Sequence, residues 1–221
     1  MEMSPGLLGT PVKNRNVPNV SKPAIAVLCS GEGTNLQAIL DATAHGRLRA
    51  RVALVISDRA EASALRRAAR AGVEACYVNP KHYPTRGRYE RALIALLDAR
   101  RVRLVCLAGF MRLLSSVFVR HYPHRILNIH PALLPAFPGA YAVRDTLAWG
   151  VRVSGVTVHF VDDLVDHGPI LLQEAVPIAP RDTERTLLER LHRVEHRLYP
   201  KAIQLVLDRR ARVSARTVRL S

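Results

Sequence analysis

The sequence predicts an α/β fold, a doubly wound and mostly parallel sheet, and two observations lead to that prediction. Short apolar runs alternate with segments of helical periodicity through the first 130 residues. The runs are apolar at nearly every position, which is typical of strands buried on both faces of a parallel sheet. A β–α–β rhythm of this kind implies right-handed crossovers, and it places ligands beyond the carboxyl ends of the strands.

The first half of the chain contains five expected strands with helices between them. The strands are AIAVLCS (24–30), RVALVIS (51–57), VEACYV (73–78), RLVCLAG (103–109) and RILNIH (125–130). Helical periodicity follows at 36–46, 61–72, 85–100 and 115–121. The first of these helices stops at Gly46, because glycine readily adopts the left-handed conformation that ends a helix.

The second half of the chain changes character after the fifth strand. Residues 131–139 carry three prolines and one glycine, which predicts a stiff loop. A short helix at about 140–149 follows, then two long strands at 153–161 and 168–178 around a polar loop at 162–167. A C-terminal helix is expected from Asp182 to Arg209, with Thr183 near its start.

Length and composition indicate one compact domain, which we place at 23–221 after a polar, proline-containing leader at 1–22 that we expect to be disordered. No apolar run approaches the ~18 residues of a membrane span, and the N-terminus lacks the order of a signal peptide. Cys29, Cys76 and Cys106 lie in apolar runs without metal-ligand spacing. They predict reduced, buried thiols in a cytoplasmic protein, and no metal site.

The net charge of +15 raises the question of nucleic acid. The basic residues are scattered along the chain rather than gathered in a stripe, and aromatic residues make up only 5% of it, too few for a base-stacking surface. We therefore expect no nucleic-acid partner. A positive field that attracts small anionic substrates is the favoured interpretation.

The loop Gly31–Asn35, GEGTN, lies between the first strand and the first helix. Glycines allow the backbone to approach an anion, and a helix N-terminus offers free N–H groups with a positive dipole end. The loop lacks the third glycine of a dinucleotide site and the lysine of a Walker A loop. An ordinary tight turn is the alternative interpretation.

Asn128 and His130 end the fifth strand, and their side chains are expected on the same face of it. An amide can stabilise a developing oxyanion, and an imidazole can stabilise charge or move a proton. Asp166 precedes the last long strand in the segment Asp-His-Gly-Pro and could orient His130. Taken alone, His130 could be a structural histidine and Asp166 a solvated turn residue.

Five segments together resemble the phosphoribosylglycinamide formyltransferase family, over about residues 24–208. They are CSGEGTNLQAIL, LAGFMRLL, NIHPALLPAFPG, GVTVHFVDDLVDHGPILLQ and VEHRLYP. The resemblance implies a Rossmann-like formyltransferase fold. It also implies transfer of a formyl group from the co-substrate 10-formyltetrahydrofolate to the amine of N1-(5-phospho-D-ribosyl)glycinamide in de novo purine biosynthesis, without a metal.

The resemblance also assigns roles to individual residues. Asn128, His130 and Asp166 match the catalytic residues, with His130 expected to be protonated. The ribonucleotide-binding residues that it implies are Gly33, Thr34, Asn35 and Glu195. The folate-binding residues that it implies are Arg86, Met111, Arg112, Leu113, Leu114 and Asn128, together with the loop 162–167.

Three positions depart from the family pattern. Tyr141 and His192 replace residues that relatives use near the substrate, and Arg103 stands where Asp is usual. The alternatives are a 10-formyltetrahydrofolate hydrolase of the same fold, a transferase that formylates initiator tRNA, and a basic nucleic-acid-binding α/β module. The expected partners are small molecules, with no membrane, and both a monomer and a homodimer fit the sequence.

Overall fold

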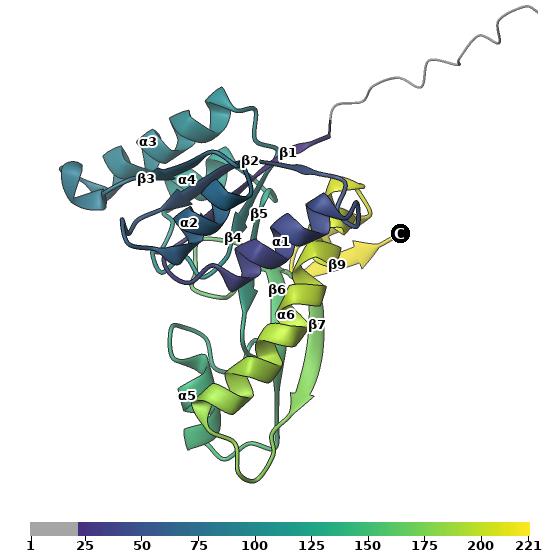
Figure 1. Cartoon of the computed structure of the whole chain (residues 1–221). Helices are drawn as coiled ribbons and strands as arrows, with labels where there is room; N and C mark the ends of the chain where they lie inside the picture. Colours follow the sequence, from purple (N-terminus) through teal and green to yellow (C-terminus); the bar gives the residue numbers. More distant parts are fainter. Residues whose placement is uncertain (1–21) are drawn as a thin grey trace, which may run out of the picture.

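A computed structural model describes residues 22–221, which form one seven-stranded sheet with helices on both faces and a separate two-stranded sheet (Figure 1). Except for Lys22, the predicted leader lies outside the described residues. The order of the large sheet is β3-β2-β1-β4-β5-β6-β7. Its strands are β1 (Ala24–Cys29), β2 (Arg51–Ser57), β3 (Ala75–Tyr77), β4 (Leu104–Leu107), β5 (Ile126–His130), β6 (Val153–Phe160) and β7 (Ile170–Pro177).

Strands β1 to β5 pair in parallel, and the strand order reverses between β1 and β4. Strands β6 and β7 extend the sheet from β5 in the antiparallel sense. The predicted fold class, a doubly wound and mostly parallel sheet with a C-terminal helix, is confirmed. The reversal matters because the chain leaves the sheet in opposite directions there, which opens a crevice at the carboxyl ends of the strands.

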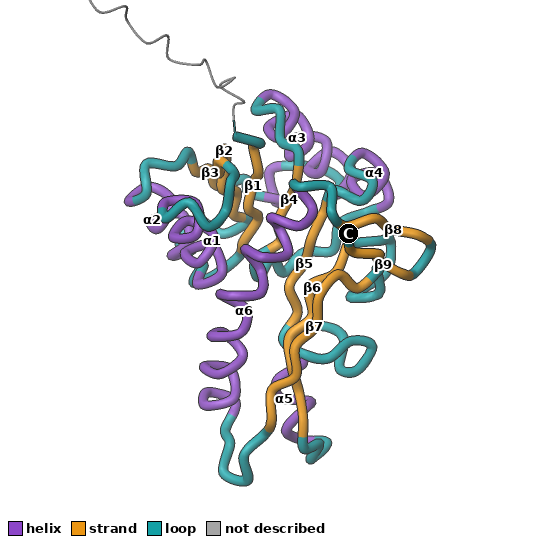
Figure 2. Tube along the Cα trace, turned by 90° about the vertical axis from the view of Figure 1, so that its right-hand side faces the viewer, coloured by secondary structure: helices purple, strands orange, loops and turns teal. Residues whose placement is uncertain are grey.

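The helices cover the two faces of the sheet in separate groups, as Figure 2 shows. The helices α1, α2 and α6 pack against one face, and α3 and α4 pack against the other. Their bounds are α1 (Thr34–Ala44), α2 (Ser63–Arg70), α3 (Arg86–Ala99), α4 (Ser116–His121), α5 (Ala142–Ala148) and α6 (Glu184–Leu207). Thr183 caps α6 in a reciprocal pair with Thr186, which explains why the helix begins where the sequence predicts.

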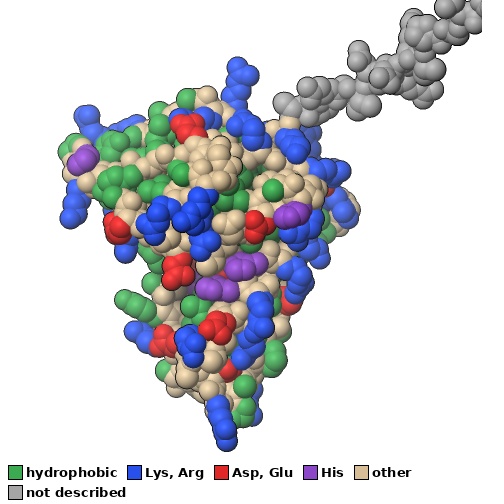
Figure 3. All heavy atoms as spheres, in the orientation of Figure 1, with side chains coloured by type: hydrophobic (Ala, Val, Ile, Leu, Met, Phe, Trp, Pro, Cys, Tyr) green, Lys and Arg blue, Asp and Glu red, His purple; other side chains and the backbone are tan. Residues whose placement is uncertain are grey.

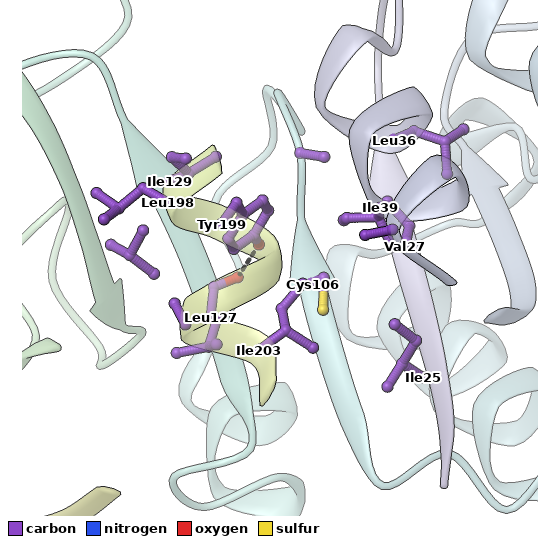
Figure 4. Close-up of a cluster of buried hydrophobic side chains, with 14 of the residues drawn as sticks. Ile25, Val27, Leu36, Ile39, Cys106, Leu127, Ile129, Leu198, Tyr199 and Ile203 are labelled. Carbon is purple, nitrogen blue, oxygen red and sulfur yellow. Dashed lines mark hydrogen bonds between the residues drawn. The ribbon is translucent and has the colours of Figure 1, made fainter. Parts of the chain in front are cut away.

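Strand β1 lies between the two cores, and all six of its residues are buried. Ile25, Val27 and Cys29 belong to the core under α1 and α6, part of which is drawn in Figure 4. Ala26 and Leu28 belong to the core under α3 and α4. The period-2 geometry of a strand sends alternate side chains to opposite faces, so an unbroken apolar run serves both cores.

Tyr199 of α6 ties the helix to the sheet just below the carboxyl ends of two neighbouring strands. Its side chain is fully buried, and its hydroxyl lies 2.8 Å from the carbonyl oxygen of Leu107 and 3.0 Å from that of Leu127. Figure 4 shows the tyrosine reaching from the helix towards Leu127. Because Leu127 precedes Asn128, this contact fixes the strand end that carries the predicted catalytic amide.

Three features differ from the sequence prediction. A two-stranded sheet of β8 (Ala211–Ser214) and β9 (Thr217–Leu220) follows α6, and a short 3-10 helix lies at Pro80–His82. Each terminal strand alternates apolar and polar residues over only four positions, and the connecting residues Ala215 and Arg216 are not typical of a hairpin turn, so the sequence did not predict a hairpin. The prediction that all three cysteines are buried is wrong for Cys76, which is partly exposed because β3 lies at the edge of the sheet.

Lysine and arginine side chains are spread over the face of the protein in Figure 3 and do not gather in one stripe. Several arginines are paired with acids, among them Arg100 with Glu74 and Arg49 with Asp208. Exposed pairs of this kind contribute little to stability. Their effect is to divide the large positive charge into local patches.

Candidate active site

The carboxyl end of β5 brings Asn128 and His130 together with Asp166, which lies 36 residues further along the chain than His130. The Nδ2 atom of Asn128 donates to Oδ1 of Asp166 at 3.2 Å. The Nδ1 atom of His130 lies 3.3 Å from Oδ2 of the same carboxylate. Both oxygens of Asp166 are therefore engaged by the two residues that share a face of β5.

The loop between β6 and β7 presents Asp166 to the strand end. Its backbone has a φ of +47° at Asp166, and Oδ2 accepts a hydrogen bond of 2.8 Å from the backbone N–H of Gly139. Gly168 allows the loop to return closely, because a Cβ atom there would lie 1.8 Å from the carbonyl oxygen of Phe160. Left-handed backbone is uncommon for residues other than glycine, and Asp is among those that tolerate it best.

The charges of Asp166 and His130 respond differently to burial. Burial raises the pKa of Asp166, but the His159 side chain, the charge of His130 and the Gly139 N–H group together lower it to about 2. Burial is the largest influence on His130 and lowers its pKa, although Asp166 and the carbonyl of Phe137 raise it in opposition. Burial thus opposes the protonated form that the sequence analysis expects of His130.

The ring of His130 is held at both nitrogens. Its Nε2 atom lies 2.8 Å from the carbonyl oxygen of Phe137, which can only accept, so the proton of the neutral ring belongs on Nε2. Its Nδ1 atom then faces the carboxylate of Asp166. Nδ1 of the neutral ring carries no proton and lies beside the carboxylate, which can stabilise the charged ring. His130 can therefore take up a proton at Nδ1 during a reaction.

His159 is a fourth polar residue of the site, and the sequence analysis missed it. Its side chain is buried, its Nδ1 atom is 2.9 Å from the carbonyl oxygen of Phe160, and its Nε2 atom is 3.2 Å from Nδ2 of Asn128. Nε2 also lies 3.6 Å from Oδ1 of Asp166. The signal available in the sequence was an inward-facing histidine on a strand that could pair antiparallel with β5.

The proline-rich loop at 131–139 is held against β6. Thr157 donates to the carbonyl oxygen of Ala132 at 2.6 Å and accepts from the N–H of Leu134 at 3.1 Å. Gln173 of β7 donates to the carbonyl oxygen of Leu134 at 2.8 Å. These bonds fix the loop that supplies the Phe137 carbonyl to His130.

The loop after β1 leads directly into the N-terminus of α1. Gly33 is the residue before the helix and has a φ of +74°, and a Cβ atom there would lie 2.7 Å from Cβ of Ala64. Only glycine fits this close approach to α2. The helix therefore starts at Thr34 with free backbone N–H groups, the arrangement that binds phosphate oxygens.

Asn35 and Glu195 join α1 to α6 beside this loop. Nδ2 of Asn35 donates to Oε2 of Glu195 at 2.8 Å, and Glu195 is almost completely buried. Burial raises the pKa of Glu195, opposed by the hydrogen bond from Asn35 and by the charge of His192. His192 stands 3.9 Å from the carboxylate, so this position, which departs from the family pattern, lies beside the predicted ribonucleotide residues.

Two cavities meet at the strand end. The smaller, about 290 Å³, is lined by Asn35, Glu195 and His192 on one side and by Asn128, His130 and Asp166 on the other. The larger, about 490 Å³, is lined by Arg86, Leu114 and the loop 162–166, and it also includes Asn128 and Asp166. A group bound in either cavity can therefore reach the same amide and carboxylate.

The predicted residues divide between these cavities, except for Met111, Thr34 and Gly33, the last of which lines neither cavity. Arg112 and Leu113 line both, whereas Met111, predicted with the folate residues, lines only the smaller one. Thr34, predicted with the ribonucleotide residues, lines a separate shallow depression together with Arg67 and His196. The described residues thus place Thr34 at the outer edge of the site.

The remaining departures from the family pattern lie away from the reacting groups. Tyr141 is exposed, and the guanidinium of Arg144 lies 4.1 Å above its ring. Arg103 precedes β4, at the opposite end of the strand from the site. Within 22–221, no cluster of histidine, cysteine and acidic side chains is suited to hold a metal ion. No helix of that part of the chain is both long and apolar enough to cross a membrane.

Comparisons with known proteins agree with this architecture. Residues 24–203 match the formyl transferase family. The trifunctional purine biosynthetic protein adenosine-3 of Gallus gallus is 47% identical over 186 residues, which are 84% of this chain but 18% of that protein. The chain thus spans less than a fifth of that relative.

Two further matches extend over nearly the whole of the other protein. A phosphoribosylglycinamide formyltransferase of Bacillus subtilis is 40% identical over 182 residues, covering 82% of this chain and 93% of that protein. The crystal structure of glycinamide ribonucleotide transformylase 1 from Symbiobacterium toebii superposes with a TM-score of 0.88 at 53% identity, covering 90% of this chain and 93% of that one. On these matches and the shared fold, the chain belongs to the phosphoribosylglycinamide formyltransferase family.

Proposed function

We propose that this protein transfers the formyl group of 10-formyltetrahydrofolate to the amine of N1-(5-phospho-D-ribosyl)glycinamide, a step of purine biosynthesis. The observation that carries the proposal is the pair of cavities that share Asn128 and Asp166. A transfer between two bound molecules requires their reacting atoms to meet at one set of polar groups. Family membership supplies the identity of the two substrates.

The smaller cavity suits the ribonucleotide. Free N–H groups at the start of α1 can bind its phosphate, and the carboxylate of Glu195 can accept hydrogen bonds from ribose hydroxyls. Asn35 holds Glu195 in place through its 2.8 Å hydrogen bond. The amine of the substrate would then point towards the trio of Asn128, His130 and Asp166.

The larger cavity suits the folate. Its walls combine apolar side chains such as Leu113 and Leu114 with the guanidinium of Arg86, which can pair with an anionic or carbonyl group. The loop 162–166 closes its other side. A flat ring bound there would have its formyl group next to Asn128.

In the proposed reaction, the neutral amine attacks the formyl carbon, a C–N bond forms, and the carbonyl oxygen becomes an oxyanion. Both N–H bonds of Asn128 face partners, one at Asp166 and one at His159. One of these bonds must be exchanged for the oxyanion, which the amide then stabilises. The bond from the formyl carbon to N10 of the folate finally breaks.

The proton released by the attacking nitrogen has to reach N10, the leaving atom. Neutral His130 can accept it at Nδ1, beside the ionised Asp166, and the carboxylate stabilises the imidazolium that results. His130 then returns the proton to N10. Holding both substrates in adjoining cavities supplies a further part of the acceleration, typically several kcal/mol.

The proposal extends to the setting of the enzyme. We infer that residues 23–221 act as a single catalytic domain in the cytoplasm, with small molecules and not nucleic acid as partners. The continuous sheet, the free cysteines and the scattered arginines support this inference.

The proposal is tested by an assay of purified protein with 10-formyltetrahydrofolate, run with and without the ribonucleotide. Folate turnover that requires the ribonucleotide, with formylated amine as the product, is the expected result. Equal turnover without the ribonucleotide, with release of formate, would establish the alternative of a hydrolase.

A further inference from the structure

Glu90 of α3 is a buried acid that takes no part in the trio. Only 1% of its side chain is exposed. Acidic side chains are almost never buried to this degree unless they are paired, because removing a charge from water is costly. The partners of Glu90 therefore indicate what the residue does.

All partners of this carboxylate are donors, and they come from two chain segments that line the larger cavity. Arg86, one turn earlier on α3, donates from Nε to Oε1 at 2.9 Å. The backbone N–H of Ser115 donates to the same oxygen at 2.8 Å, and the Ser115 hydroxyl donates to Oε2. One buried charge thus joins an arginine of the cavity to a second segment that lines the cavity.

The two groups that Glu90 holds are both exposed to the cavity. Arg86 keeps 49% of its side chain accessible while its Nε is fixed. Ser115 directly follows the wall segment Arg112–Leu114 and precedes α4. Its hydroxyl does not cap α4, as a serine before a helix commonly does, because it is committed to Glu90.

We propose that Glu90 is a positioning residue for the folate: its carboxylate fixes the direction of the Arg86 guanidinium and anchors the Arg112–Leu114 wall. The inference rests on the proposed function and extends it to a residue that touches neither substrate. Arginine side chains carry much rotamer entropy, so an arginine held at Nε loses less of it when a ligand binds to its remaining N–H groups.

The test is a kinetic double-mutant cycle with Glu90→Gln and Arg86→Ala. The amide of Gln keeps an oxygen for the N–H groups of Arg86 and Ser115 and can donate to the Ser115 hydroxyl, but it removes the charge that strengthens these hydrogen bonds. We expect Glu90→Gln to raise KM for 10-formyltetrahydrofolate about tenfold, with KM for the ribonucleotide unchanged and kcat nearly so. In the Arg86→Ala background that factor should shrink at least about threefold, because the two residues act as a unit.

Glu61→Gln is the matched control. It makes the same chemical change and removes the same charge at an exposed position outside both cavities. Both KM values should stay within about twofold of wild type, as for an ordinary surface substitution. Thermal unfolding of each variant, followed by circular dichroism, separates a loss of positioning from a loss of folded protein.

Ser115→Ala provides a second, milder variant that leaves Arg86 paired with Glu90. It should raise KM for the folate by less than Glu90→Gln does, and it gives a result even where Glu90→Gln is too unstable to assay. Equal increases in both KM values, an unchanged folate KM, or the same Glu90→Gln factor with and without Arg86 would each overturn the proposal. Failure of the wild-type protein to require the ribonucleotide would instead refute the proposed function.

Discussion

Asn128 and His159 stand directly opposite each other on the antiparallel strands β5 and β6, with Nδ2 of the amide 3.2 Å from Nε2 of the imidazole. The Nδ1 atom of His159 is committed to the carbonyl oxygen of Phe160, so its Nε2 is the acceptor. The amide is therefore oriented by the histidine, and its carbonyl and amino ends cannot exchange without loss of that bond. The pairing of β5 with β6 therefore fixes the direction in which the N–H bonds of Asn128 point.

His159→Phe should lower kcat about tenfold and leave both KM values nearly unchanged. The ring volume is kept, but the acceptor that orients the Asn128 amide is lost, and one hydrogen bond of this kind is worth about 1 kcal/mol. Steady-state kinetics with each substrate varied in turn give the answer. An increase in either KM with kcat intact would place His159 in a binding role.

Asp166→Asn should lower kcat by two or more orders of magnitude, because the variant keeps the shape of the side chain but cannot stabilise a protonated His130. Both KM values should be retained. Asp163→Asn is the control, because this substitution removes the same charge from an exposed position in the same loop. If Asp163→Asn were the inactive variant, the acid of the site would have been assigned to the wrong position.

The free energy of unfolding should fall as the pH drops below the ordinary His130 pKa of 6.5, because burial lowers that pKa in the folded state. Over this range the unfolded chain binds more protons than the folded one, so acid favours unfolding. Asp166, whose pKa is lowered to about 2, contributes only at much lower pH, between its ordinary value of 3.8 and about 2.

Urea unfolding between pH 7.5 and 5 measures this dependence. The slope should be shallower in His130→Asn, which lacks the titrating ring, and unchanged in His82→Asn, where an exposed histidine is removed. A wild-type slope identical to that of His130→Asn would show that His130 titrates alike in the folded and unfolded states.

Gly33→Ala should raise KM for the ribonucleotide and destabilise the fold, because the new Cβ atom would lie 2.7 Å from Cβ of Ala64 and would displace the start of α1. Gly46→Ala is the matched control. Gly46 has a similar φ of +71°, but a Cβ atom there would have no neighbour within 4 Å. Both substitutions place alanine at a positive φ, which costs about 1 kcal/mol of stability in each case. A change in KM for the ribonucleotide is expected only for Gly33→Ala, where the new Cβ atom also meets Ala64.

Glu195→Gln should raise KM for the ribonucleotide about tenfold or more, since it removes a buried charge that can bind hydroxyls and that Asn35 holds. KM for the folate should stay within about twofold, because Glu195 does not line the larger cavity. A larger increase in KM for the folate than for the ribonucleotide would show that the folate occupies the smaller cavity and the ribonucleotide the larger one.

Strands β1, β2 and β4 were predictable because each is an almost uninterrupted apolar run that serves two cores. The shared face of Asn128 and His130 followed from the period of a strand and needed no tertiary information. The closeness of Asp166 to them could not be derived that way, since a left-handed residue and the close return at Gly168 deliver it. The match to the family motif supplied that residue.

The residues that the sequence missed depend on contacts between distant segments. His159 belongs to the site only because the β5–β6 register places it opposite Asn128. Glu90 became notable only when α3 and the segment before α4 were seen to share its carboxylate. Met111 lines only the smaller cavity whereas Arg112 and Leu113 line both, a division within one short loop that a linear motif does not record.

The antiparallel pair β6–β7 has a consequence for the order in which this site can form. The five parallel strands carry the loop proposed to bind phosphate, Asn128 and His130, whereas His159 and Asp166 arrive only when the hairpin docks on β5. The centre of a sheet opens later than its edges, because its strands are paired on both sides and more deeply buried. Amide hydrogens of β7 at the sheet edge should exchange faster than those of β1 at its centre, and the chemistry of the enzyme should be lost before its nucleotide-binding half unfolds.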